Sequence, residues 1–179
     1  HEARGSLWKE SVYGFRYIFR RPSLLGLQLV FFFGNLLLSL AFVLLNPMIL
    51  SRTGNNEVIL SLVQAGFGVG AVIGGLILVR TGGLKRRVHG VLLGWFLTSL
   101  FGTVIFGVGR TLTIWLVFGL LAAIVNTYIN ASNQSIWQSK VAPDVQGRVF
   151  STRRVIAQVI GPLGILLAAA WSRVISPAE

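Results

Sequence analysis

The chain contains no cysteine and only two histidines, His1 and His89, among its 179 residues. These counts exclude disulfide frameworks, thiol nucleophiles and metal sites built from Cys and His. Acidic residues are scarce too, with five Asp and Glu against 16 Lys and Arg. No nucleophile elbow, Walker loop or zinc-protease motif occurs. The sequence therefore predicts no enzyme, no metal site and no cofactor.

Charged residues make up only 12% of the chain, compared with about 25% in soluble domains, while 54% of the residues are apolar. Five charge-free apolar stretches are each close to a bilayer in length, at 24–45, 58–79, 90–109, 112–131 and 155–171. None alternates apolar and polar residues with period two, as barrel strands would. The sequence therefore predicts an all-α membrane protein with five transmembrane helices and a lipid bilayer as its surroundings.

The cations alternate between the two sides of the predicted membrane. One side carries 13 of the 16 Lys and Arg, and the other carries only Arg52, Arg110 and Arg173. Because basic residues in short loops stay in the cytoplasm, the amino terminus is predicted to lie inside and the carboxy terminus outside. This alternation accounts for the net charge of +11 without a nucleic-acid partner.

Two regions are predicted. Residues 1–22 form a cytoplasmic linker, in which apolar residues at helical spacing between 6 and 21 indicate an amphipathic helix at the inner interface. Pro22 disfavours a straight continuation into the membrane. Residues 23–179 form a partial transmembrane bundle. Since the chain does not begin with Met, we expect it to be a fragment.

Glycines in two spans predict how helices pack and bend. Gly66, Gly70 and Gly74 recur every four residues, a spacing that lets a neighbouring helix approach closely. In the last span, Gly161 and Pro162 predict a kink, because proline frees a backbone carbonyl and glycine permits bending.

Amide side chains line one face of the fourth span. At about 100° per residue, Asn126, Asn130 and Asn133 fall in one narrow sector. Lipid cannot satisfy amides, so this face is predicted either to bond to other helices or to line a polar cavity. Asn35 and Gln64 are lone amides in the first two spans and carry the same two alternatives.

Residues 138–151, which read QSKVAPDVQGRVFS, are similar to the V-P-x-x-x-Q-G-R-V loop of one transporter family. The whole chain resembles the C-terminal half of a major facilitator superfamily transporter, of the bacterial macrolide-efflux and enterobactin-exporter branch. Gly75, Arg80 and Gly82 also match the superfamily's G-x-x-x-D-R-x-G-R-R loop, although Val79 replaces the acidic residue.

The resemblance implies that the spans are helices seven to eleven of a twelve-helix fold in the bacterial inner membrane. It implies a secondary active transporter that exports a lipophilic drug-like compound or siderophore by alternating access, with proton antiport. The missing amino-terminal half would complete the substrate cavity. The implied cavity residues are Asn126, Asn130, Asn35 and Gln64, and the implied cytoplasmic gate residues are Gly75, Arg80, Gly82, Asp144, Gly147 and Arg148.

Two other classes stay open. A membrane subunit of an ATP-driven transporter would need a cytoplasmic helix that docks an ATPase. In a membrane scaffold that transports nothing, the amide stripe would only join helices.

Overall fold

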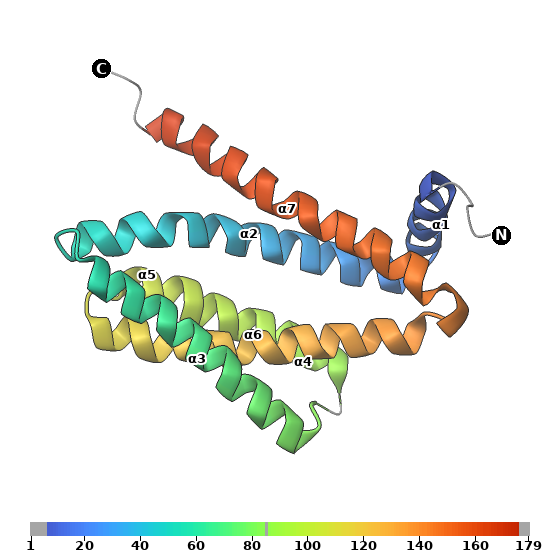
Figure 1. The fold of residues 1–179 in the computed structure, drawn as a ribbon, viewed down its shortest axis with the longest axis horizontal. Helices are drawn as coiled ribbons and strands as arrows, with labels where there is room; N and C mark the ends of the chain where they lie inside the picture. Colours follow the sequence, from blue (N-terminus) through green and yellow to red (C-terminus); the bar gives the residue numbers. More distant parts are fainter. Residues whose placement is uncertain (1–6, 85, 176–179) are drawn as a thin grey trace. The chain divides into compact units, whose positions relative to one another are not determined.

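The computed structural model describes residues 7–84 and 86–175, and its regular secondary structure over these ranges is entirely helical (Figure 1). Four helical segments are long and apolar enough to cross a membrane: α2 (Pro22–Arg52), α3 (Glu57–Thr81), the run from α4 to α5 (Arg87–Val108) and α6 (Leu112–Lys140). The prediction of an all-α fold is therefore confirmed for the described residues, and four of the five predicted spans lie in helices that could cross a membrane.

The fifth predicted span, 155–171, lies within α7 (Gln146–Ile175), whose side chains are described only in part beyond residue 159. That α7 crosses the membrane stays a prediction. The helix is unbroken through Gly161 and Pro162, and the kink predicted there is likewise untested. Residues 1–6 of the predicted linker lie outside the described residues.

Several helices extend beyond the apolar stretches that predicted them. α2 continues from residue 45 through Pro47 to Arg52, and α6 continues from residue 131 to Lys140. The reason is that polar residues end a hydropathy window without ending a helix, since backbone hydrogen bonds do not depend on side-chain polarity. A proline inside a helix removes one backbone hydrogen bond and crowds the carbonyl of the preceding turn, which bends the helix without having to end it.

Sequence-encoded caps set both ends of α3. The Asn56 Oδ1 accepts hydrogen bonds from the backbone N–H groups of Val58 and Ile59, both at 3.1 Å. At the other end Gly82 adopts φ 68°, and its N–H bonds to the Leu78 carbonyl at 2.9 Å. Asparagine accepts from the first free N–H groups, and glycine takes the left-handed conformation at little cost.

A π-helical segment interrupts the third span. The α-helix α4 (Arg87–Ser99) passes into η1 (Leu100–Ile105), which is a π-helix, and then into the short helix α5 (Phe106–Val108). The hydropathy of this span does not predict the π-helix. Hydropathy depends only on which residues are present, whereas a π-helix differs from an α-helix in its hydrogen-bond pattern.

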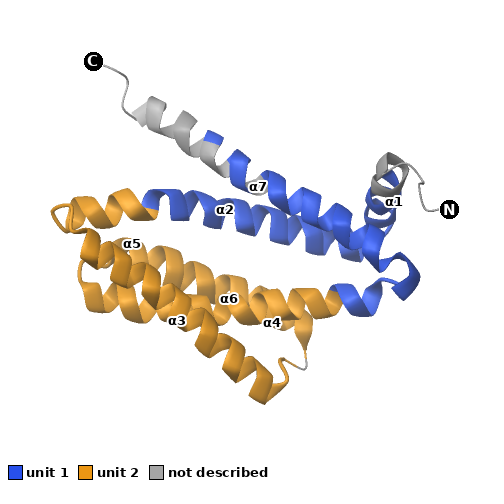
Figure 2. Cartoon of the chain, viewed as in Figure 1, with its two compact units in different colours: residues 1–44, 137–179 blue, residues 45–136 orange. Residues whose placement is uncertain are grey.

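The chain divides into two compact units, residues 1–44 with 137–179 and residues 45–136 (Figure 2). The first unit has a core of Ile18, Leu24, Trp137, Val141 and Val149. Here α1 (Leu7–Phe19) packs on α7, and Gly14 is the contact point, because a Cβ added there would lie 2.9 Å from the Arg148 carbonyl oxygen.

The second unit contains α3, α4 and most of α6. Near the predicted outer end of its spans, Leu45, Ile49, Val63, Phe106 and Trp115 form a buried cluster. The indole N–H of Trp115 donates to the Phe106 carbonyl at 3.2 Å, which satisfies a carbonyl in the last turn of the π-interrupted span.

Candidate functional site

Helix α6 packs closely on α3 through the glycines of α3. A Cβ added at Gly70 would lie 2.6 Å from the Leu120 carbonyl oxygen, and one at Gly74 would lie 3.0 Å from the Ile124 Cα. Gly66 faces the Leu116 side chain, at 3.1 Å from its Cδ2. At Gly70 and Gly74, by contrast, the α3 backbone meets the α6 backbone, and a larger residue there would force the helices apart.

The same helix packs on the third span through a different side. Gly94 faces Ile129, Gly90 faces Ser132 at 3.4 Å from its Oγ, and Gly102 faces Ala122 at 3.2 Å from its Cβ. In the second unit, α6 is therefore held from two sides by glycine-rich surfaces.

The amide stripe of α6 lies between these two surfaces. The line of contact with α3 passes from Leu116 to Thr127 and on to Tyr128, whose hydroxyl lies 2.9 Å from that of Thr81. At about 100° per residue, Thr127 and Tyr128 point in directions increasingly different from those of Asn126 and Asn130. Asn126 is half-buried and Asn130 is exposed.

Asn126 and Asn130 bond to each other along the helix. The Asn130 Nδ2 donates to the Asn126 Oδ1 at 2.7 Å and to the Asn126 carbonyl at 2.9 Å. These bonds use the Asn130 NH₂ as donor and the two oxygens of Asn126 as acceptors. They do not involve the Asn126 NH₂ or the Asn130 side-chain oxygen.

Asn133, one turn further along the stripe, is only 2% exposed. Its side-chain oxygen has no hydrogen-bond partner in the part of the chain that the structure describes. A buried amide oxygen without a partner is costly, so the packing around Asn133 leaves one hydrogen-bond acceptor unsatisfied.

The two other amides have local partners. The Asn35 Nδ2 donates to the Phe31 carbonyl of its own helix at 2.6 Å, and the Gln64 Nε2 lies 3.4 Å from the Asn46 Oδ1. Gln64 thus links α3 to the end of α2. Neither bond reaches the stripe on α6.

The predicted gate residues lie at helix ends in different units. Arg80 is exposed in the last turn of α3, one residue before Thr81, and Gly82 caps that helix, while Gly75 lies in the preceding turns. In the first unit, the exposed Asp144 lies in a 3₁₀ turn (η2, Pro143–Val145), and Gly147 and Arg148 follow in the first turn of α7. The guanidinium carbon of Arg148 lies 5.9 Å from the centre of the Tyr13 ring.

Neighbouring Arg153 is more buried, and this burial lowers the pKa of its guanidinium. Its guanidinium carbon lies 5.2 Å from the centre of the Trp137 ring. A half-buried cation over an indole face joins the start of α7 to the core of the first unit.

Sequence analysis missed a contact at the predicted outer end of the second unit. The Arg52 Nη1 donates to the carbonyls of Gly107 at 2.6 Å and Gly109 at 2.8 Å. These carbonyls end the third span, where helical partners are lacking. The available signal was that Arg52 is one of only three cations on that side.

The amide stripe offers hydrogen-bond donors and acceptors. Among the described residues, no group of three or more His, Asp and Glu could hold a metal ion. The chain matches no protein-family model, no curated protein and no solved structure.

Proposed function

We propose that the chain is part of a secondary active transporter that exports a lipophilic compound or siderophore across the bacterial inner membrane. Its support is the resemblance of the 138–151 loop and the presence of four apolar helices suited to a membrane. In such transporters, two halves enclose a substrate near the middle of the bilayer and open alternately to each side.

The amide stripe of α6 is the observation that carries this proposal. It holds the Asn126–Asn130 pair and, one turn further on, the buried Asn133, whose side-chain oxygen has no hydrogen-bond partner among the described residues. Because hydrocarbon leaves amides unsatisfied, the stripe requires a polar partner. A cargo with carbonyls and hydroxyls supplies both acceptors and donors.

The same family resemblance leads us to propose that proton antiport drives export. The described spans contain no Asp or Glu in their central parts, so the coupling carboxylates would lie in the absent half. Residues 1–22 would then connect the two halves at the cytoplasmic surface.

The test replaces Asn126 with Ala in the full-length protein, with Thr127→Ala as its matched control. Both positions lie on α6, but Thr127 packs against Gly74 and belongs to the α3 contact. We expect Asn126→Ala to change which compounds are exported by a strain that lacks other pumps. Thr127→Ala should instead alter stability and leave the order of substrates unchanged.

A membrane scaffold predicts the opposite result for Asn126. If its amide only stabilises the bundle, Asn126→Ala should lower the free energy of unfolding by about 0.6 kcal/mol, the average for such bonds, and leave the export profile as it was. Resistance profiles and unfolding in detergent, measured on the same variants, separate the two roles.

A further inference from the structure

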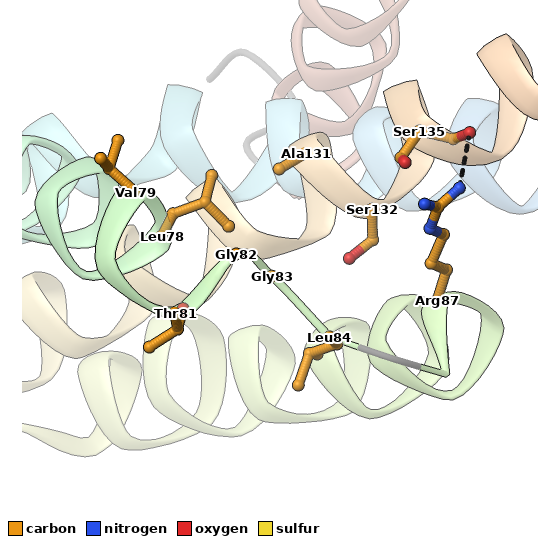
Figure 3. Close-up of a pocket in the computed structure, with 10 residues that line it drawn as sticks. All are labelled: Leu78, Val79, Thr81, Gly82, Gly83, Leu84, Arg87, Ala131, Ser132 and Ser135. Carbon is orange, nitrogen blue, oxygen red and sulfur yellow. Dashed lines mark hydrogen bonds between the residues drawn. The ribbon is translucent and has the colours of Figure 1, made fainter.

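A second polar site lies in the second unit, away from the amide stripe. The end of α3, the turn at 82–84, the start of α4 and residues 131–135 of α6 enclose a pocket of about 600 Å³ (Figure 3). Gly82 and Gly83 both have positive φ, at 68° and 82°, a conformation that glycine adopts readily. Because both residues are glycines, the turn that borders the pocket carries no side chain for two residues. The pocket lies where α3 ends and α4 begins, which the predicted topology puts at the cytoplasmic surface of the membrane.

Hydrogen-bond donors face this pocket. Arg87 reaches from α4 to α6, where its Nη1 donates to the Ser135 carbonyl at 3.2 Å, and this bond uses one of five guanidinium donors (Figure 3). The Ser132 hydroxyl points toward the turn at 82–84. The Thr81 hydroxyl also lies in the lining, but it is already bonded to the Ile77 carbonyl and the Tyr128 hydroxyl, both at 2.9 Å. A guanidinium with four remaining donors beside a serine hydroxyl matches the oxygens of a phosphate group.

The positive charge here has no carboxylate to balance it within the second unit. The sequence contains no Asp or Glu between Glu57 and Asp144. Glu57 begins α3 and Thr81 ends it, so the two are separated by about 36 Å at 1.5 Å per residue, several times the screening length in physiological salt. Arg80, Arg86 and Arg87 therefore give this end of the unit an unbalanced positive charge, which attracts anions.

Apolar side chains adjoin the same cations. Val79 is 83% exposed and also lines the pocket, while Val88 on α4 is 57% exposed. An anion alone would leave these surfaces without a partner. An amphiphile with an anionic head and apolar chains covers both.

We propose that this pocket binds the phosphodiester headgroup of an anionic membrane lipid. Arg87 and the Ser132 hydroxyl contact the phosphate, Arg80 and Arg86 add positive charge at the adjoining helix ends, and the acyl chains run along Val79 and Val88. The predicted topology places the site on the inner leaflet. The proposal concerns binding alone, so its failure and the failure of the transport proposal are separate results.

The first experiment measures binding of fluorescent phosphatidylglycerol to the full-length protein in a neutral detergent. We expect unlabelled phosphatidylglycerol to compete, and phosphatidylcholine and inorganic phosphate to compete at least tenfold more weakly. Arg87→Gln should weaken binding about fivefold, the effect of one basic residue near an anionic surface. The matched control is Arg110→Gln, which removes an exposed cation from the opposite end of the unit and should leave affinity unchanged.

Each contrary result overturns the proposal. Equal competition by phosphatidylcholine would mean that only the acyl chains bind, and equal competition by inorganic phosphate would make this a site for a soluble anion. Equal losses in Arg87→Gln and Arg110→Gln would mean that net charge alone attracts the lipid.

A second experiment locates the lipid without disturbing Arg87. Because the chain lacks cysteine, Ser135→Cys introduces a single thiol into the pocket and keeps the backbone carbonyl that Arg87 contacts. Phosphatidylglycerol should slow maleimide labelling of this thiol, and phosphatidylcholine should not. A thiol at the exposed Thr113, near the other end of α6, should label at the same rate with either lipid. Unchanged labelling at position 135 with bound phosphatidylglycerol would place the lipid elsewhere.

Discussion

Replacing Gly70 with Ala adds one methyl group at the closest approach of α3 and α6. That methyl carbon would lie 2.6 Å from the Leu120 carbonyl oxygen and 2.9 Å from the Leu120 Cα and the Ala123 Cβ. Carbon atoms in contact are ordinarily about 3.5–4.0 Å apart. Two of the three neighbours are backbone atoms that cannot rotate away, so the helices must separate by about 1 Å.

Two opposing effects determine how much Gly70→Ala changes the free energy of unfolding. Alanine stabilises a helix interior by up to about 1 kcal/mol relative to glycine, and overpacking costs about 1–3 kcal/mol. Gly68→Ala is the matched control, because a Cβ there meets no described atom within 4 Å. We therefore expect Gly70→Ala to be less stable than Gly68→Ala by about 1–3 kcal/mol, although both changes are chemically identical.

Unfolding in detergent with added denaturant, followed by fluorescence of the five tryptophans, measures this difference. Gly70→Leu should enlarge the loss, since a longer side chain meets the same backbone. Equal stability of Gly70→Ala and Gly68→Ala would refute the close contact between α3 and α6.

Two further predictions concern the outer end of the spans and the topology. Arg52→Ala should lower the free energy of unfolding by about 0.5–1.5 kcal/mol, because two helix-end carbonyls lose their donor, and the same assay on Arg110→Ala should show a smaller change; equal effects would mean that Arg52 acts only through its charge. A cysteine at Ser51 should react with an impermeant maleimide added outside intact cells and one at Ser139 should not, and the reverse pattern would invert the predicted orientation.

Hydropathy and local chemistry determined much of the fold. The second span was predicted at 58–79 and lies in α3 at Glu57–Thr81, because transfer of a helix into lipid depends on its composition and length. Its ends follow from Asn56 and Gly82, whose capping interactions involve only neighbouring residues. The amide stripe on α6 was also visible, since helical periodicity alone places Asn126 and Asn130 together.

Contacts between distant segments required the tertiary structure. Gly66, Gly68 and Gly70 look alike in the sequence, yet two of them face α6 and one faces open space, because the direction of a helix face has meaning only once its neighbour is placed. The bonds of Arg52 to Gly107 and Gly109 span more than 50 residues, and Arg87 meets Ser135 across 48. Such pairings depend on how whole helices pack against each other. Packing involves residues that are far apart in the sequence, so a short segment alone does not predict it.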